Sequence, residues 1–210
     1  MALPRDLEVE SSSEPGGRRP APGALAQVQA FVNTNDREAG HDVLDSPARL
    51  RAWLDEKAGL DVGPVTRRQY VRAIALREAM RALAIANAGG RAGPEPLDIV
   101  NAEAERTRLG LEFEPDAVRP RSAATGFDGF VAGLLEAVAQ SMINGSWGRL
   151  KACRRDACQW VFFDRSPNAA AAWCDMRICG SREKAKTYYR RRSRDGARGR
   201  LDSPERASLD

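Results

Sequence analysis

The sequence has 210 residues, of which 42% are hydrophobic, so a chain of this length can bury a substantial core. A single histidine, His41, excludes Ser-His-Asp triads, Cys-His pairs and most catalytic metal sites. The net charge is +4, but residues 145–210 carry 16 Lys or Arg against 8 Asp or Glu, whereas the rest has a net charge of −4. A basic segment on an acidic body indicates a polyanionic partner for that segment.

Residues 1–23 are rich in Ser, Pro and Gly and are predicted to form a disordered arm. This arm lacks the apolar stretch of a signal peptide, and no run of 18 apolar residues occurs in the chain. We therefore expect a cytoplasmic protein without a membrane span.

Residues 24–146 have the pattern of a helical domain. Apolar spacing predicts helices from Leu25 to about Thr34, from Pro47 onward, and over 64–87, 94–108 and 127–143. A weaker alternation predicts a small β-hairpin that joins 109–114 to 117–122. Several side chains are expected on the inner faces of these helices, among them Val71, Leu97, Asn101, Met142 and Ile143.

Residues 147–194 contain every cysteine of the chain, arranged as two Cys-x4-Cys pairs separated by fifteen residues. A strand is predicted over 160–163, a turn over 165–168, a possible return strand over 170–173 and a helix over 182–192. This order is that of a small treble-clef-like module, and residues 195–210 are predicted to form a disordered tail. The expected fold class is mainly α, with this module after the helical domain.

Four clustered thiols favour a structural zinc site with the ligands Cys153, Cys158, Cys174 and Cys179. Two disulfides, a redox switch and an iron–sulfur cluster are the alternatives. Four thiolates leave no open position on zinc for activating water, and no phosphate loop or nucleophile motif is present, so an enzyme is not expected.

The basic residues of this module are candidate nucleic-acid contacts, because a helix braced by zinc can present cations to phosphates. They could instead neutralise the thiolates, and the module could bind RNA or a protein. The candidates are Arg149, Lys151, Arg154, Arg155, Arg177, Arg182, Lys184, Lys186, Arg190, Arg191 and Arg192.

Polar residues on the apolar helical stripes suggest an effector pocket for a small molecule or protein in the helical domain. The candidates are Asn33, Thr34, Arg77 and Glu78. Helix capping and an internal ion pair are the competing interpretation.

The module resembles the CGNR zinc finger from residue 149 to residue 194. The matching segments are Arg149-Leu150-Lys151-Ala152-Cys153, Cys158-Gln159-Trp160-Val161-Phe162, Asp164-Arg165-Ser166, Trp173-Cys174 and Cys179-Gly180-Ser181-Arg182. The last segment departs from the Cys-Gly-Asn-Arg pattern at Ser181, which can still cap a helix.

The helical domain resembles the ABATE domain, which is described as a stress-induced transcription regulator. The segments that carry the resemblance are Phe31-Val32-Asn33-Thr34, Leu50-x-x-Trp53-Leu54, Leu76-Arg77-Glu78-Ala79 and Asn101. The two resemblances imply a bacterial DNA-binding regulator with bound Zn²⁺, for which the nucleoid is an expected location.

Overall fold

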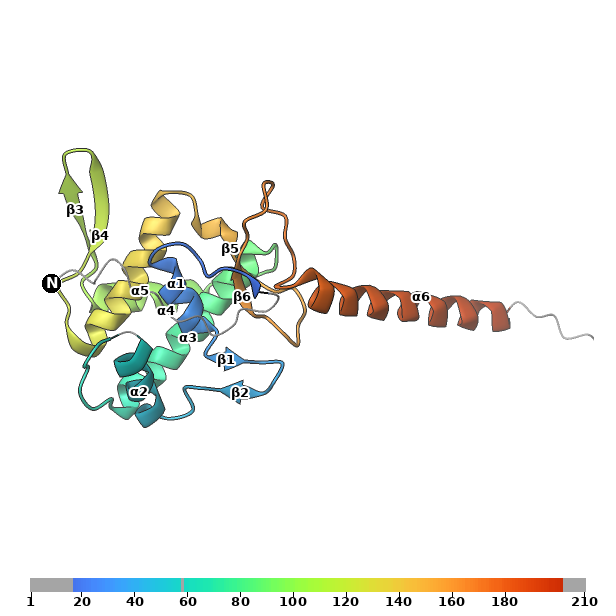
Figure 1. Cartoon of the computed structure of the whole chain (residues 1–210), viewed down its shortest axis with the longest axis horizontal. Helices are drawn as coiled ribbons and strands as arrows, with labels where there is room; N and C mark the ends of the chain where they lie inside the picture. The colour runs from blue at the N-terminus through green and yellow to red at the C-terminus, as the bar shows by residue number, and fades with distance from the viewer. Residues whose placement is uncertain (1–16, 58, 202–210) are drawn as a thin grey trace, which may run out of the picture.

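The computed structural model describes residues 17–57 and 59–201, except for the side chains of residues 191 and 193–201. Within these ranges no helix is long and apolar enough to cross a membrane. The elements form a helical body with a projecting β-hairpin on one side and a long helix on the other (Figure 1).

The helices of the body are α1 (Leu25–Val32), α2 (Pro47–Lys57), α3 (Arg67–Asn87), α4 (Glu95–Arg106) and α5 (Gly126–Ile143). They confirm the prediction of a mainly α fold. Helix α3 begins with a capping box, in which the Thr66 hydroxyl accepts a hydrogen bond from the Gln69 backbone and the Gln69 side chain accepts one from the Thr66 backbone.

Two antiparallel hairpins belong to the body. β1 (Asn35–Asp36) pairs with β2 (His41–Asp42), and β3 (Gly110–Glu114) pairs with β4 (Ala117–Arg121). The second hairpin is the one that the sequence predicts. Figure 1 shows that it extends away from the helices.

The C-terminal segment starts with the short 3-10 helix η2 (Trp147–Arg149), followed by β5 (Leu150–Ala152) and β6 (Val161–Phe163). A π-helical turn, η3 (Met176–Gly180), leads directly into α6 (Ser181–Leu201). β6 pairs with β5, so the predicted return strand over 170–173 is wrong. The partner of β6 is β5, the strand that precedes the first cysteine pair, and not a segment that follows β6.

The core begins where Phe31 of α1, Trp53 of α2 and Phe130 of α5 meet. The ring centroids of Phe31 and Phe130 lie 5.4 Å apart with an edge-to-face geometry. Buried side chains of α3 continue this cluster toward the C-terminal segment. The same cluster includes Trp147, Leu150, Ala152, Val161 and Phe163. The helical body and the cysteine-bearing segment therefore share one hydrophobic core.

Several side chains expected inside are exposed. Val71, Leu97 and Asn101 lie on the outer faces of α3 and α4, and Met142 and Ile143 lie on the last turn of α5. The sequence alone does not say which part of an apolar stripe another helix covers. The partner elements of α3 and α4 reach only part of each stripe.

The two predicted disordered ends differ from the structure within the described residues. Residues 17–23 pack on the molecule, because Ala21 is buried and Arg18 donates to the Trp173 carbonyl oxygen at 3.1 Å. Helix α6 extends to Leu201, beyond the predicted start of the tail at 195, because no proline interrupts it before residue 204. The remaining parts of both ends, 1–16 and 202–210, lie outside the described residues.

Candidate zinc centre and basic surface

The four cysteine sulfurs converge on one buried point. All four Sγ atoms lie within 4.8 Å of one another. Cys174 Sγ is 3.7 Å from Cys158 Sγ and 3.6 Å from Cys179 Sγ. These distances exceed a disulfide bond of about 2.05 Å. They match the separation of about 3.8 Å between the corners of a tetrahedral zinc–thiolate centre with bonds of about 2.3 Å.

The four thiols alter one another's ionisation. Hydrogen bonds from Cys158 and Cys174 lower the pKa of Cys153 to about 2. The hydrogen bond to Cys153, together with burial, raises the pKa of Cys158 to about 12. The pKa of Cys174 is raised for the same reasons, and that of Cys179 by burial and by the Cys153 charge. Without a metal, one thiolate therefore suppresses ionisation of the others, whereas a divalent ion stabilises all four.

Local structure holds each pair of cysteines in place. Cys153 follows β5 and Cys158 ends a turn, with the Cys158 backbone nitrogen donating to the Arg155 carbonyl at 2.8 Å. The second pair is positioned by Asp175, whose carboxylate accepts hydrogen bonds from the backbone nitrogens of Arg177 and Ile178. Asp175 thus caps the turn that carries Cys179. The expectation that Ser181 caps the helix is wrong, because Ser181 is itself helical and lies within the continuous η3–α6 turn.

One face of strand β6 packs against the cysteines and the other packs against the core of the helical body. Val161 and Phe163 join the main core, and Phe162 packs with the cysteines on the opposite face. This division follows from the alternation of side chains along a strand. The zinc centre is consequently attached to the body by a strand that is buried on both faces.

Two predicted nucleic-acid contacts, Arg149 and Lys151, make internal bonds instead. Lys151 Nζ lies 2.9 Å from Asp164 Oδ2, and both side chains are buried, with exposed fractions of 7% and 1%. Arg149 Nη1 donates to the carbonyl oxygens of Asp164 and Ser166 at 3.0 and 2.8 Å. Burial alone would raise the pKa of Asp164, but hydrogen bonds from Lys151, Ser166 and the Ala171 backbone hold it well below its usual range.

Arg154, Arg155 and Arg182 contact the helical body. Arg154 Nε donates to the carbonyl oxygen of Ala88, after the end of α3, at 2.5 Å. Arg155 Nη1 lies 2.6 Å from Glu38 Oε1, at the tip of the β1–β2 hairpin, and Arg182 binds the same carboxylate oxygen. The contact with the Glu38 carboxylate raises the pKa of Arg155.

The remaining candidates lie on the surface. Arg177 is largely exposed and pairs weakly with Asp175 at 3.6 Å. Among the candidates on α6, the side chains of Lys184, Lys186, Arg190 and Arg192 are exposed. Arg192 donates to the Tyr188 hydroxyl at 3.0 Å. Arg191 belongs to the helix, but its side chain lies outside the described residues.

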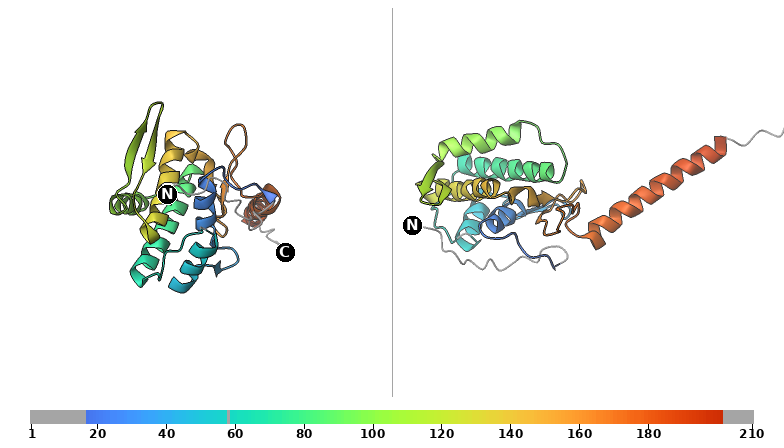
Figure 2. Two further views of the ribbon diagram at one scale, coloured as in Figure 1. Left: turned by 60° about the vertical axis from the view of Figure 1, so that its left-hand side comes forward. Right: turned by 90° about the horizontal axis from the view of Figure 1, so that it is seen from above.

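Helix α6 projects from the body as a single rod (Figure 2). Its 21 residues carry nine Lys or Arg against two Asp or Glu. At about 1.5 Å per residue it is about 32 Å long. None of its described side chains belongs to either hydrophobic cluster.

Asn33, predicted to line an effector pocket, binds strand β6. Its Nδ2 donates to the Val161 carbonyl oxygen at 2.8 Å, and its Oδ1 accepts from the Val161 backbone nitrogen at 2.8 Å. The Asn33 amide therefore makes the same pair of hydrogen bonds to the Val161 backbone that a neighbouring strand would make. Asn33 and Thr34 also line a cavity of about 310 Å³ between the helical body and Trp160.

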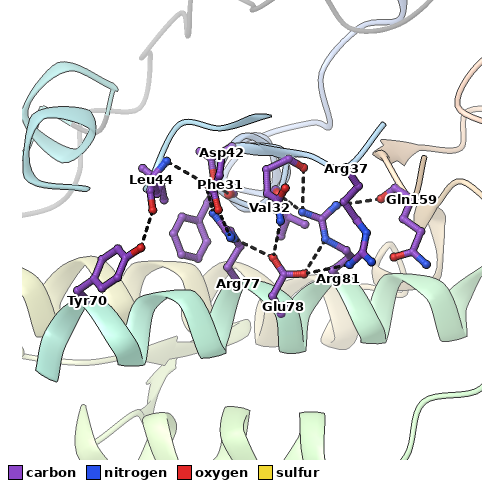
Figure 3. Close-up of polar contacts among 12 residues, drawn as sticks. Phe31, Val32, Arg37, Asp42, Leu44, Tyr70, Arg77, Glu78, Arg81 and Gln159 are labelled. Atoms are coloured by element: carbon purple, nitrogen blue, oxygen red, sulfur yellow. Dashed lines mark hydrogen bonds and ion pairs between the residues drawn. The ribbon is translucent and has the colours of Figure 1, made fainter. Parts of the chain in front are cut away.

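Arg77 and Glu78 do not line that cavity but belong to a buried ionic network under the β1–β2 hairpin (Figure 3). The Arg77 guanidinium binds Asp42 with two bonds of 2.7 Å, and Glu78 joins Arg77 to Arg81 with contacts of 2.9 and 3.0 Å. Both arginine side chains are only 2% exposed. Burial opposes ionisation of Glu78, but the charges of Arg81 and Arg77 hold its pKa below its usual range.

Arg81, which was not among the predicted site residues, extends this network into the cysteine-bearing segment. It donates to the carbonyl oxygens of Val32 and Gln159 at 2.7 and 3.0 Å. Gln159 adopts a positive φ of 50°, next to Cys158. The spacing of Arg77, Glu78 and Arg81 on one helix is the signal that could have indicated an ion-pair cluster, but none of its distant partners is visible in the sequence.

Comparison with known families agrees with this arrangement. The model described as "CGNR zinc finger" matches residues 149–192, and the ABATE model, described as "Putative stress-induced transcription regulator", matches residues 25–144. No curated protein matches the chain. The matched segments are the part that holds the cysteines and the helical body that supports it. The chain belongs to the ABATE family and carries a CGNR zinc finger with a zinc site formed by four cysteines.

Proposed function

We propose that this protein regulates transcription by binding DNA through α6, with zinc fixing the base of that helix. The observation that carries the proposal is the projecting basic helix, which has nine cationic residues among 21 and contributes no described side chain to a hydrophobic cluster. An isolated helix of this composition gains little stability from packing. Phosphates would supply the counter-charge and the contact surface that the body does not provide.

The zinc centre has a structural role in this proposal. It anchors the first turn of α6 through Cys179, and the shared core anchors the zinc centre to the body. Zinc bound by four cysteines has no open coordination position, which supports a role in folding over one in catalysis. Because thiolate ligands persist in reducing compartments, we place this activity in the cytoplasm, at the nucleoid.

The helical body is the candidate sensor. Of the four predicted effector residues, Asn33 and Thr34 line the 310 Å³ cavity. Arg77 and Glu78 form ion pairs within the ionic network instead. We propose that any small effector enters this cavity. Trp160 also lines the cavity and lies two residues beyond the ligand Cys158, so it would transmit the effect of effector binding to the zinc module.

Protein binding is the second candidate function. Met176 and Ile178 are exposed beside the zinc centre, and Tyr188 and Tyr189 are exposed on α6. Exposed apolar and aromatic side chains of this kind are typical of protein interfaces. A partner for these residues would be an acidic protein.

A direct titration separates these functions. The zinc-loaded chain is titrated against labelled double-stranded DNA, single-stranded RNA and an acidic control polypeptide at several salt concentrations. DNA binding that weakens linearly with the logarithm of salt concentration, and that exceeds RNA binding, is the expected result. Preference for RNA, or binding to the polypeptide alone, would replace the proposal with the corresponding alternative.

A further inference from the structure

The tip of the β1–β2 hairpin places a carboxylate against the base of the basic helix. Glu38 Oε1 is bound by Arg155 of the first cysteine loop at 2.6 Å and by Arg182 of the first turn of α6. Arg155 and Glu38 are separated by more than a hundred residues in the sequence. One oxygen atom thus receives two guanidinium groups from the zinc finger.

A cavity of about 290 Å³ lies at this position. Its lining includes the cations Arg155, Arg182 and Lys186, together with Asp156 and Glu183. Glu38 does not line this cavity, but its carboxylate binds Arg155 and Arg182, so two of the three lining cations already hold an oxyanion.

The hairpin tip is held in a fixed conformation. Asp36 Oδ1 accepts hydrogen bonds from the backbone nitrogens of Glu38 and Ala39, each at 3.0 Å. Gly40 follows with a φ of +65°, which a residue with a side chain rarely adopts. Below the tip, Arg77 binds Asp42 of β2 and Arg81 donates to the Asn35 carbonyl of β1. The buried network therefore determines where Glu38 lies.

The ion pair is not needed to hold the finger on the body. That attachment is made by the shared hydrophobic core and by buried polar bonds, such as those from Asn33 to Val161 and from Asn87 to Leu150. The side chains of Glu38 and Arg182 are 34% and 53% exposed, so their pairing adds little stability. It does offset one of the two positive charges that Arg155 and Arg182 place at the base of the helix that we propose contacts DNA.

We propose that the Arg155–Arg182–Lys186 cavity is a phosphate-binding site and that Glu38 competes with phosphate for its two arginines. This inference rests on the proposed function of α6. A DNA phosphate would displace the Glu38 carboxylate and exchange one oxyanion for another on the same two arginines. The hairpin would thereby weaken non-specific binding, because a duplex must first break the internal ion pairs.

The test compares Glu38→Gln with Glu114→Gln in the full, zinc-loaded chain. Glu114 is a matched control, because it also pairs with an arginine, Arg119, but lies on the β3–β4 hairpin. Each variant is titrated with a labelled mixed-sequence DNA duplex at several salt concentrations. Zinc content and thermal stability are measured alongside.

We expect Glu38→Gln to bind about 2-fold to 30-fold more tightly than the wild type, the range given by two partly exposed ion pairs. Its salt slope should increase by roughly 0.7–0.9, which corresponds to one additional phosphate contact. Glu114→Gln should match the wild type. In an Arg182→Gln background the gain from Glu38→Gln should shrink, because one of the released cations is missing.

Equal or weaker binding by Glu38→Gln, or the same gain in Glu114→Gln, would overturn the inference while leaving DNA binding by the wild type intact. Loss of zinc from Glu38→Gln would also overturn it, because the ion pair would then have a structural role. If neither the wild type nor Glu38→Gln binds DNA at low salt, the proposed function itself fails and this inference fails with it.

Discussion

The basic residues at the start of the zinc finger and those on α6 are similar in composition but differ in surroundings. Arg149, Lys151 and Arg154 use their donors on carbonyl and carboxylate oxygens inside the molecule. Lys184 and Arg190 face solvent. The first group holds the loops around the cysteines, and the second is available to a polyanion. A basic cluster in a sequence therefore contains two populations that only the partners of each side chain distinguish.

Zinc removal should produce the largest effect, because it affects both groups at once. We expect chelation, or Cys174→Ser, to unfold the finger and to lower the melting temperature of the helical body as well. Structural zinc supplies much of the folding free energy of such modules, and here Trp147, Leu150 and Val161 would lose their place in the shared core. Calorimetry and far-UV circular dichroism with and without chelator measure this. A helical body that melts at an unchanged temperature would show that the two parts fold independently.

A matched pair of lysine substitutions sharpens the comparison between the two groups. Lys151→Gln breaks a buried ion pair and should lower the free energy of unfolding by about 3 kcal/mol, at the low end for such pairs because Asp164 keeps other donors. Lys184→Gln removes the same charge from an exposed position on α6. It should leave stability unchanged and lower the salt slope of DNA binding by about 0.7–0.9.

Denaturant unfolding and salt-dependent DNA titration of both variants provide the measurements. The comparison fails if the two substitutions change stability equally, or if Lys151→Gln lowers the salt slope of a correctly folded protein as much as Lys184→Gln does.

Asn33→Ala should have a smaller effect on stability, of about 2 kcal/mol, because it leaves the Val161 backbone nitrogen without its side-chain partner, whereas the Val161 carbonyl oxygen keeps the Gln29 amide at 3.3 Å. Asn144→Ala is the control, since Asn144 occupies the same position after α5 that Asn33 occupies after α1, but its side chain is exposed and accepts its hydrogen bonds from the nearby Ser146. Its expected effect is below about 0.5 kcal/mol. Thermal unfolding of both variants tests this, and equal losses would remove Asn33 from the junction between body and finger.

The sequence predicted those features that depend on neighbouring residues. The apolar stripe of α5, the β3–β4 hairpin and the spacing of the four cysteines are local patterns, and the structure has all three. The predicted return strand failed because strand pairing depends on which segment folds back. β5 and β6 pair across the first cysteine loop.

The contacts of the candidate site residues that the sequence did not reveal depend on distant partners. Lys151 pairs with Asp164, and Asn33 bonds to Val161, only in the folded chain. Glu38 was not singled out at all, because a glutamate in a turn carries no signal of the two arginines that bind it. Side-chain partners far apart in sequence are set by the fold, and no local spacing encodes them.

The most direct test of the central claim replaces Lys184, Arg190 and Arg192 of α6 with Gln in the full chain and measures DNA affinity as a function of salt concentration. Because these side chains are exposed, zinc content and melting temperature should stay at wild-type values. We expect weaker binding at every salt concentration and a salt slope lower by about 2–3, which corresponds to the loss of three phosphate contacts. A folded, zinc-loaded variant with the affinity and slope of the wild type would contradict the assignment of α6 as the DNA-binding element.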